Sequence, residues 1–200
     1  MNTAKSTTKD KNFKPLIFIV ALLAAVAAAV IIALVFGDSA KAPNNNDIAT
    51  STEWKPFKSS EHGFTVSFPG FPTTDRQDLD VYGVIVPYTT YTKETNDRSF
   101  VAAISNYPEQ IDIMSNPRGV LDGSINGSAQ NSGSTIEESS NDIEFLGNPA
   151  GSAVLKSTSG GKTMTMYALY FLKDNNLYML MAAGVSQSDF DKFTSSFHFN

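Results

Sequence analysis

An unbroken apolar run near the N-terminus constrains this chain more than any other feature. Leu16 to Phe36 is 21 consecutive apolar residues without one polar side chain. A helix of that length spans roughly 30 Å, the thickness of the hydrocarbon core of a bilayer. Pro15 precedes the run, at a position where a helix does not use the N–H that proline lacks. We therefore expect a transmembrane anchor over residues 15–36.

A cleaved signal peptide is the alternative, but its apolar region usually has about 7–15 residues. The sequence after the run also suits cleavage poorly, because Asp38-Ser39-Ala40 carries a carboxylate and Pro43 follows the next small-residue site. Four lysines lie in residues 1–14, whereas Lys41 alone soon follows the helix. The flank of a membrane helix that carries more Lys and Arg usually lies in the cytoplasm. We expect a single-pass signal-anchor at the cell membrane, with residues 1–14 cytoplasmic and the C-terminal part extracytoplasmic.

Small residues recur along the expected helix. Ala21, Ala25, Ala29 and Ala33 fall four residues apart, a spacing that lets two membrane helices approach closely. An alanine-rich helix also produces such spacing by chance. These four alanines are the candidate helix-association face, and a homo-oligomer through the anchor is one hypothesis for this chain.

The part of the chain after the apolar run is acidic, with 19 acidic and 11 basic side chains. Nucleic-acid binding depends on clustered Lys and Arg that neutralise phosphates. The basic residues here are scattered, which argues against nucleic acid as a main partner and against a domain that reads anionic lipid. The chain has no cysteine, which excludes disulfides, thiol catalysis, thiolate metal sites and an acylated N-terminal cysteine.

Residues 37–52 are rich in small and polar residues such as Asn, Ala and Asp, without apolar periodicity, which predicts a flexible linker. The folded domain is expected over residues 53–200. Its first strand is Phe64 to Phe68, where apolar and polar residues alternate between Gly63 and Pro69. Further strands are expected on either side of Gly83 within residues 79–92, and over residues 100–107.

A helix is expected from Asn116-Pro117 to about Gln130, because an Asn cap followed by proline is a common helix start. The residues that recur at helical spacing are Val120, Leu121, Ser124, Ile125 and Ser128. Gly119, Gly123 and Gly127 fall four apart, which indicates either close packing against a neighbour or a weak helix.

The C-terminal third predicts strands over residues 143–146, 152–157, 162–173 and 177–185, and a terminal helix capped by Ser188. The strands over 162–173 and 177–185 are apolar on both faces, which indicates layers above and below the sheet. The fold class is therefore α+β: a mostly antiparallel sheet of six to eight strands with helices on both faces, preceded by one transmembrane helix.

Three segments resemble a broad group of secreted or membrane-anchored bacterial domains. They are Glu61 to Pro69, Leu146-Gly147-Asn148-Pro149-Ala150 and Phe193 to Phe197. The group is largely uncharacterised and is similar in fold to PsbP, the extrinsic subunit of photosystem II, and to the Ran-binding nuclear import factor. The resemblance covers roughly Trp54 to Phe199 and implies a PsbP-like α/β/α sandwich. It also implies a non-enzymatic binding or assembly role, and its motifs are structural, so no metal or cofactor residue carries over.

Two motifs invite a chemical interpretation. Gly160-Gly161-Lys162-Thr163 lacks the first glycine of a phosphate-binding loop and precedes a strand, which favours a hairpin turn. Met164, Met166, Met179 and Met181 form two Met-x-Met pairs that suit Cu(I). With Asn175-Asn176 as turn residues, Met179 faces Leu172 and Met181 faces Tyr170. The two pairs then lie ~13 Å or more apart, which favours core packing over a metal site.

The remaining polar candidates are few. His62 is expected at a solvated turn and His198 on the outer side of a final strand. Without a Gly-x-Ser-x-Gly motif, nothing local supports a Ser-His-Asp triad. Two acidic clusters do not match a calcium loop and are expected to be solvated; they are Asp75, Asp78 and Asp80, and Glu137, Glu138, Asp142 and Glu144.

We expect a membrane-anchored, extracytoplasmic, non-catalytic binding or assembly module without cofactor, catalytic or metal residues. Its partner would be a protein or an envelope component. One alternative is a hydrolase of envelope polymers that uses a carboxylate pair brought together by the fold. Another is a structural subunit that associates through its transmembrane helix.

Overall fold

The computed structural model describes residues 53–81, 83–95, 97–159 and 161–200. The expected anchor, the linker and the candidate face of Ala21, Ala25, Ala29 and Ala33 lie outside these residues. Within the described ranges, no helix is long and apolar enough to cross a membrane.

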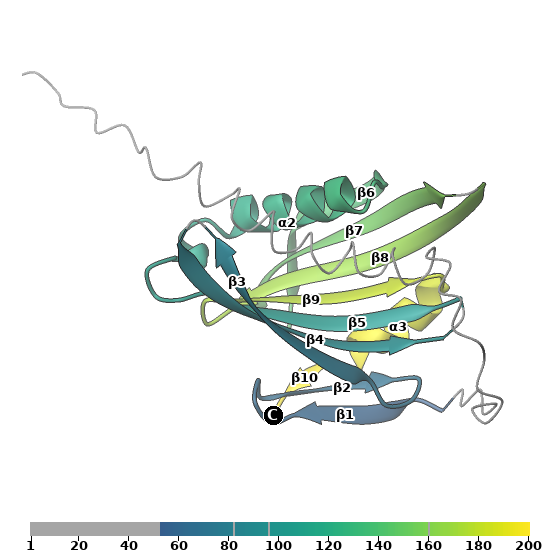
Figure 1. The fold of residues 1–200 in the computed structure, drawn as a ribbon, viewed down its shortest axis with the longest axis horizontal. Coiled ribbons are helices and arrows are strands. Elements are labelled where there is room, and N and C mark those ends of the chain that lie inside the picture. The colour runs from purple at the N-terminus through teal and green to yellow at the C-terminus, as the bar shows by residue number, and fades with distance from the viewer. Residues whose placement is uncertain (1–52, 82, 96, 160) are drawn as a thin grey trace, which may run out of the picture.

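Seven strands form one antiparallel sheet in the order β3-β4-β5-β9-β8-β7-β6 (Figure 1). These strands are β3 (Thr73–Val81), β4 (Val84–Glu94), β5 (Ser99–Asn106), β6 (Thr135–Phe145), β7 (Asn148–Ser159), β8 (Lys162–Lys173) and β9 (Asn176–Ala183). Strands of this sheet that follow one another in the chain are hydrogen-bonded neighbours, except β5 and β6, which are separated by β9, β8 and β7. The expected antiparallel sheet of six to eight strands is therefore confirmed.

The strand at Phe64–Phe68 does not belong to this sheet, which corrects the expectation of one sheet. It is β2 of a separate three-stranded sheet, with β1 (Lys55–Ser59) on one side and β10 (His198–Phe199) on the other. The inner face of β2 holds Phe64, Val66 and Phe68, all with no exposed surface. Alternation in the sequence indicates that one face of a strand is buried, but it does not indicate which sheet the strand joins.

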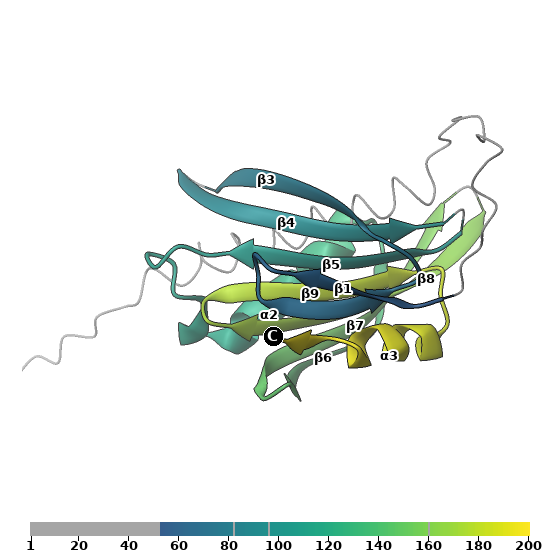
Figure 2. The ribbon, with the colours of Figure 1, turned by 90° about the horizontal axis from the view of Figure 1, so that it is seen from below.

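The domain has three layers (Figures 1 and 2). The helix α2 (Pro117–Asn131) packs on one face of the main sheet, over β6, β7 and β8. The other face is covered by the three-stranded sheet together with α3 (Gln187–Ser195), which contacts β2, β8 and β9. Helices lie on both faces as expected, but the small sheet shares the second face with α3.

Strand β8 is apolar on both sides because it separates two cores. Met164, Met166, Ala168 and Tyr170 lie in the core on the α2 side. Tyr167, Leu169 and Phe171 face the other core, which is rich in aromatic rings. All four paired methionines are buried, and Met166 and Met181 have no exposed surface. Their burial supports the packing interpretation.

The register of the β8–β9 hairpin corrects the expected one by two positions. Asp174 and Asn175 are the turn residues, with φ of 49° and 59°, and a two-residue hairpin turn of this kind requires positive φ at both positions. Lys173 therefore pairs with Asn176, so that Met179 lies opposite Tyr170 and Met181 opposite Ala168. The two methionine pairs come closer together than the expected register would place them.

Both helix starts follow capping chemistry. The Oδ1 atom of Asn116 accepts a hydrogen bond from the Gly119 N–H at 3.2 Å, and Pro117 is the first helical residue, as expected. Gly119 serves this cap, because an added Cβ would lie 2.2 Å from the Asn116 amide nitrogen. The cap of α3 is Ser186, whose Oγ accepts from the Asp189 N–H at 3.1 Å. The expected cap at Ser188 was therefore wrong by two residues.

Candidate binding groove

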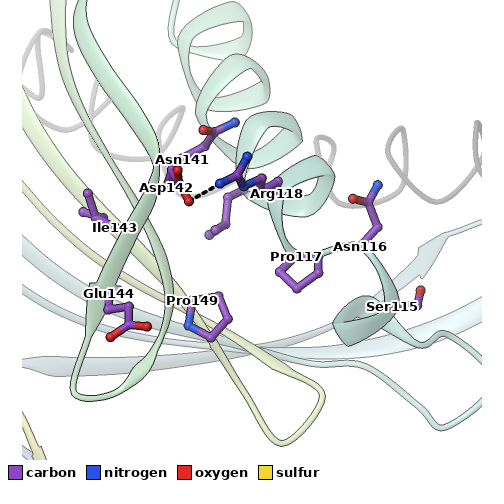
Figure 3. A pocket seen from close by; sticks show the side chains of 10 residues that line it. Ser115, Asn116, Pro117, Arg118, Asn141, Asp142, Ile143, Glu144 and Pro149 are labelled. Atoms are coloured by element: carbon purple, nitrogen blue, oxygen red, sulfur yellow. Dashed lines mark ion pairs between the residues drawn. The ribbon is translucent and has the colours of Figure 1, made fainter.

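A surface groove of about 410 Å³ opens between the start of α2 and the second half of β6 (Figure 3). We call it the α2–β6 groove. Asn116, Pro117 and Arg118 form its helix side, and Asn141 to Glu144 form its strand side. Leu121, which has no exposed surface, and Pro149 also line it. The groove is therefore polar along both walls and has apolar residues between them.

Local structure positions each wall. The Asn116 cap and Pro117 fix the first turn of α2, which places Arg118 on the groove side. The strand side is irregular, because the pairing of β6 with β7 shifts register between Ser140 and Ile143. Such a bulge bends the strand and re-aims its side chains. Ile143 stays 37% exposed at this bend.

The groove carries more negative than positive charge. Arg118 forms an ion pair with Asp142, and both side chains are more than 60% exposed. A surface pair of this kind contributes at most about 1 kcal/mol to stability. The amide of Asn141 donates to Asp122 at 2.6 Å, which brings a second carboxylate to the helix wall. With Glu144, three carboxylates lie at or beside a groove in which Arg118 is the one cation among the lining residues.

Two of these carboxylates test the hydrolase alternative. Asp142 and Glu144 both line the groove from β6. Figure 3 shows Asp142 turned to Arg118 and Glu144 turned away toward the β7 side. A glycosidase acid needs a carboxyl group sheltered from water, whereas Asp142 is 69% exposed and ion-paired. This geometry suits the binding of a cationic group better than proton transfer.

A second groove of about 290 Å³ lies on the opposite face of β6 and β7. Tyr167 and Phe190 line it and stack on each other with ring centroids 5.6 Å apart. Glu138 is its one lining carboxylate. The smaller volume and single charged group make it the weaker candidate.

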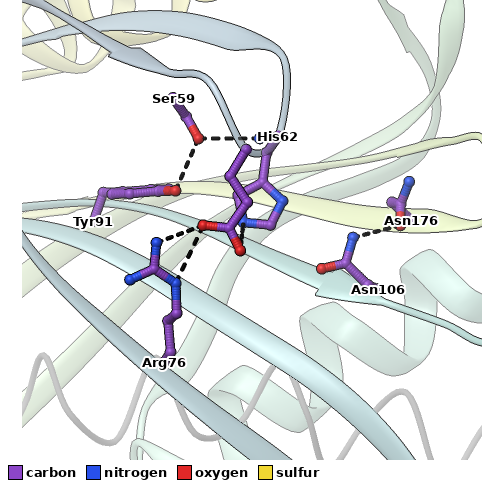
Figure 4. A network of polar contacts seen from close by, with 7 residues as sticks. Ser59, His62, Arg76, Tyr91, Asn106 and Asn176 are labelled. Atoms are coloured by element: carbon purple, nitrogen blue, oxygen red, sulfur yellow. Dashed lines mark hydrogen bonds and ion pairs between the residues drawn. The ribbon is translucent and has the colours of Figure 1, made fainter.

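A polar network joins the β1–β2 turn to the main sheet (Figure 4). Arg76 of β3 donates through its Nε to Glu61 at 3.2 Å. The hydroxyl groups of Ser59 and Tyr91 are hydrogen-bonded at 2.8 Å, and Ser59 also accepts from the backbone N–H of His62. Because Ser59 contacts the backbone of His62 and not its imidazole, this cluster is not a Ser-His-acid triad.

The side chain of His62 is 7% exposed, which corrects the expectation of a solvated turn. Its Nε2 is buried without a hydrogen-bond partner among the described residues and lies 3.9 Å from Glu61 Oε1. Burial lowers the pKa of His62, an effect that the nearby Glu61 carboxylate opposes. The hydrogen bond from Arg76 in turn lowers the pKa of Glu61.

The remaining sequence candidates lie apart from the groove. His198 is exposed as expected, and Asp75, Asp78 and Asp80 are exposed along β3. Gly161 lies in a turn that leads into strand β8, so the phosphate-loop interpretation is excluded. In the described part of the chain, no three His, Asp or Glu side chains are placed to hold a metal ion.

Sequence reasoning found the acidic cluster of β6 and the cap of α2, but it did not bring them together. Comparing the length of the helix with that of the strand after it could have predicted that the two meet. The 15 residues of α2 span about 22 Å, which about seven strand residues also cover. A strand that starts after the turn at Ser132–Ser134 and runs back along the helix therefore reaches Arg118, at the start of α2, near Asp142.

Comparison with known proteins identifies the fold. No protein-family model matches the chain, and no curated protein matches it. Among solved structures, cyanobacterial PsbP (CyanoP) from Synechocystis sp. PCC 6803 superposes with a TM-score of 0.52. The domain has a PsbP-like fold. The match covers 80% of this chain and 99% of CyanoP at 13% sequence identity.

The expectation of a PsbP-like sandwich is thus confirmed at the level of the fold. A protein of unknown function from Pseudomonas aeruginosa, PA94, described as a putative regulator, is a more distant match. It has a TM-score of 0.36 and 12% identity, and the match covers 70% of this chain and 87% of PA94.

Proposed function

We propose that this protein is a membrane-anchored, extracytoplasmic, non-catalytic docking module, and that its α2–β6 groove binds a protein segment carrying basic and apolar residues. The observation that carries the proposal is the groove itself: exposed carboxylates beside a partly exposed Ile143, with Leu121 and Pro149 between the walls. Basic side chains of a partner would pair with Asp142 and Glu144. An apolar side chain would contact Ile143.

The position of the groove supports this role. Strand pairing places the β6–β7 turn at the end of the domain that holds Asn106, Lys173 and Asn176. The chain enters the domain at the opposite end, where Lys55 pairs with Phe68. If residues 15–36 anchor the protein, the groove lies on the half of the domain that faces away from the membrane, where a soluble or membrane protein can reach it.

Photo-crosslinking in cells tests this proposal. A photoreactive residue at position 143 of the full-length protein should give a discrete adduct. The same residue at position 136 should not, although Ile136 and Ile143 are both on β6 and both 37% exposed. Glu144→Lys, which leaves the Arg118–Asp142 pair in place, should reduce the adduct at position 143, and so should high salt.

Mass spectrometry of the adduct should locate the crosslink in a segment containing Lys or Arg. Equal adducts from positions 136 and 143, or an adduct that Glu144→Lys leaves unchanged, would overturn the proposal.

A further inference from the structure

The turn between β2 and β3 presents an aromatic side chain to solvent. Phe71 is 71% exposed, the most exposed large apolar side chain of the described residues. Pro69 and Pro72 flank it and limit the conformations of the turn, and Gly70 adopts a φ of 108°. A single exposed apolar residue is ordinary, so the surroundings of Phe71 decide what it means.

Lysines and a second aromatic ring lie on the same part of the surface. The Nζ atom of Lys55 is 5.1 Å from the centroid of the Phe71 ring. Lys93 packs against Gly70, where an added Cβ would lie 3.1 Å from its Cε. Lys192 covers Trp54 at 4.9 Å. Aromatic rings beside long basic side chains are typical of surfaces that sit at the membrane–water interface.

This patch lies where the chain enters the domain. Lys55 pairs with Phe68 immediately before the turn, and Thr73 pairs with Thr92 immediately after it. Figure 2 shows the start of β1 and the β2–β3 connection at one end of the domain and the start of α2 at the other. The sequence predicts a linker over 37–52, and a flexible chain of that length spans about 20–24 Å on average. This end of the domain is therefore held close to the bilayer.

We propose that the turn of residues 69–72 seats Phe71 in the interfacial layer of the membrane that holds the anchor. The inference rests on the anchorage in the proposed function and adds an orientation to it. The apolar ring provides the contact with the lipid, and Glu53, 4.0 Å from Lys55, offsets the charge of the lysine nearest to it. The acidic β6 edge and its groove then point into solution.

Fluorescence quenching in vesicles tests this orientation, since the chain has no cysteine and a single tryptophan. Full-length protein with Phe71→Cys or Leu146→Cys would carry an apolar, environment-sensitive label, which at position 71 takes the place of the ring, and would be reconstituted in phosphatidylcholine vesicles. Leu146 is 51% exposed at the opposite end of the domain and serves as the control. We expect doxyl groups on the lipid chains to quench the label at position 71 and to leave the label at position 146 unquenched.

A second readout avoids the label. Doxyl lipids should quench the native Trp54, and Phe71→Ser should weaken that quenching, whereas Ile85→Ser, at a site 50% exposed on β4, should not. Protein that floats with the vesicles but shows equal quenching at positions 71 and 146 would overturn the orientation alone. Protein that does not float with the vesicles would overturn both the anchorage and the orientation.

Discussion

The side chain of His62 makes the stability of the domain depend on pH. It lies on the β1–β2 turn, where its ring contacts Tyr91 of β4 edge-on at 6.2 Å. Arg76 of β3 reaches the same turn through Glu61. A neutral imidazole fits this site, because protonation would place a charge on a buried nitrogen that has no hydrogen-bond partner among the described residues, and this burial outweighs the nearby Glu61 carboxylate.

Acid should therefore weaken the domain through His62. Burial lowers its pKa below the ordinary value of 6.5, so the unfolded state binds the proton first. The stability is fully present above pH 6.5 and is lost as the pH falls from there toward the folded-state pKa. Urea denaturation of residues 51–200 should show this loss as the pH falls below 6.5. His62→Gln should flatten it, whereas His198→Gln should leave it unchanged. An equal slope in the His62→Gln variant would contradict this account.

At the scale of elements, the β8–β9 hairpin is held to the rest of the fold by its turn. The side-chain amide of Asn175 donates to the carbonyl oxygens of Tyr107, Pro108 and Ile111, and its Oδ1 accepts from the Ile113 N–H at 3.0 Å. These bonds tie the turn to the 3-10 helix η1 (Ile113–Ser115) and the chain that leads to α2. The turn therefore supports the approach to the groove.

Asn175→Gly should separate the side-chain bonds from the turn geometry, because glycine tolerates the positive φ. We expect a loss of about 1–3 kcal/mol in the free energy of unfolding, since several hydrogen bonds to one region disappear together. Asp174→Gly is the control: it also has a positive φ, but its side chain is exposed. A matched effect of the two substitutions in denaturant titrations would show that the turn geometry, and not the amide, matters.

Some helices and strands were easier to predict from the sequence than others. Strand β8 was predicted with its observed bounds because turn residues lie on both sides of it. The helix α2 was predicted from its cap and from residues that recur at helical spacing. Most of β6 was missed, since exposed polar residues such as Glu137, Glu138 and Ser139 cover it. It is an edge strand with two bulges, features that discourage pairing with another chain. Local composition does not distinguish such a strand from a loop.

For the whole molecule, the sequence did not predict which segments far apart in the chain lie together. The alternation of β2 fixed its buried face, but its separation into a second sheet depends on pairing with β10, more than a hundred residues later. The α2–β6 groove likewise depends on the start of α2 and the second half of β6 lying side by side. The acidic residues were identified from sequence, whereas their partner Arg118 and the bend at Ile143 required the fold.

The proposed function gives the molecule two distinct ends. Phe71 and the lysines lie where the chain enters, and the β6–β7 turn and the α2–β6 groove lie toward the other end. In this proposal an anchor over residues 15–36 holds the domain outside the cytoplasm, so that the groove meets extracytoplasmic partners.

Labelling with a membrane-impermeant maleimide tests that claim most directly, because the chain has no cysteine of its own. Full-length protein with Leu146→Cys should react in intact cells, since position 146 is 51% exposed on the described domain. Full-length protein with Ser6→Cys should react only after the membrane is permeabilised. Labelling at position 6 in intact cells, with position 146 protected until permeabilisation, would contradict the account.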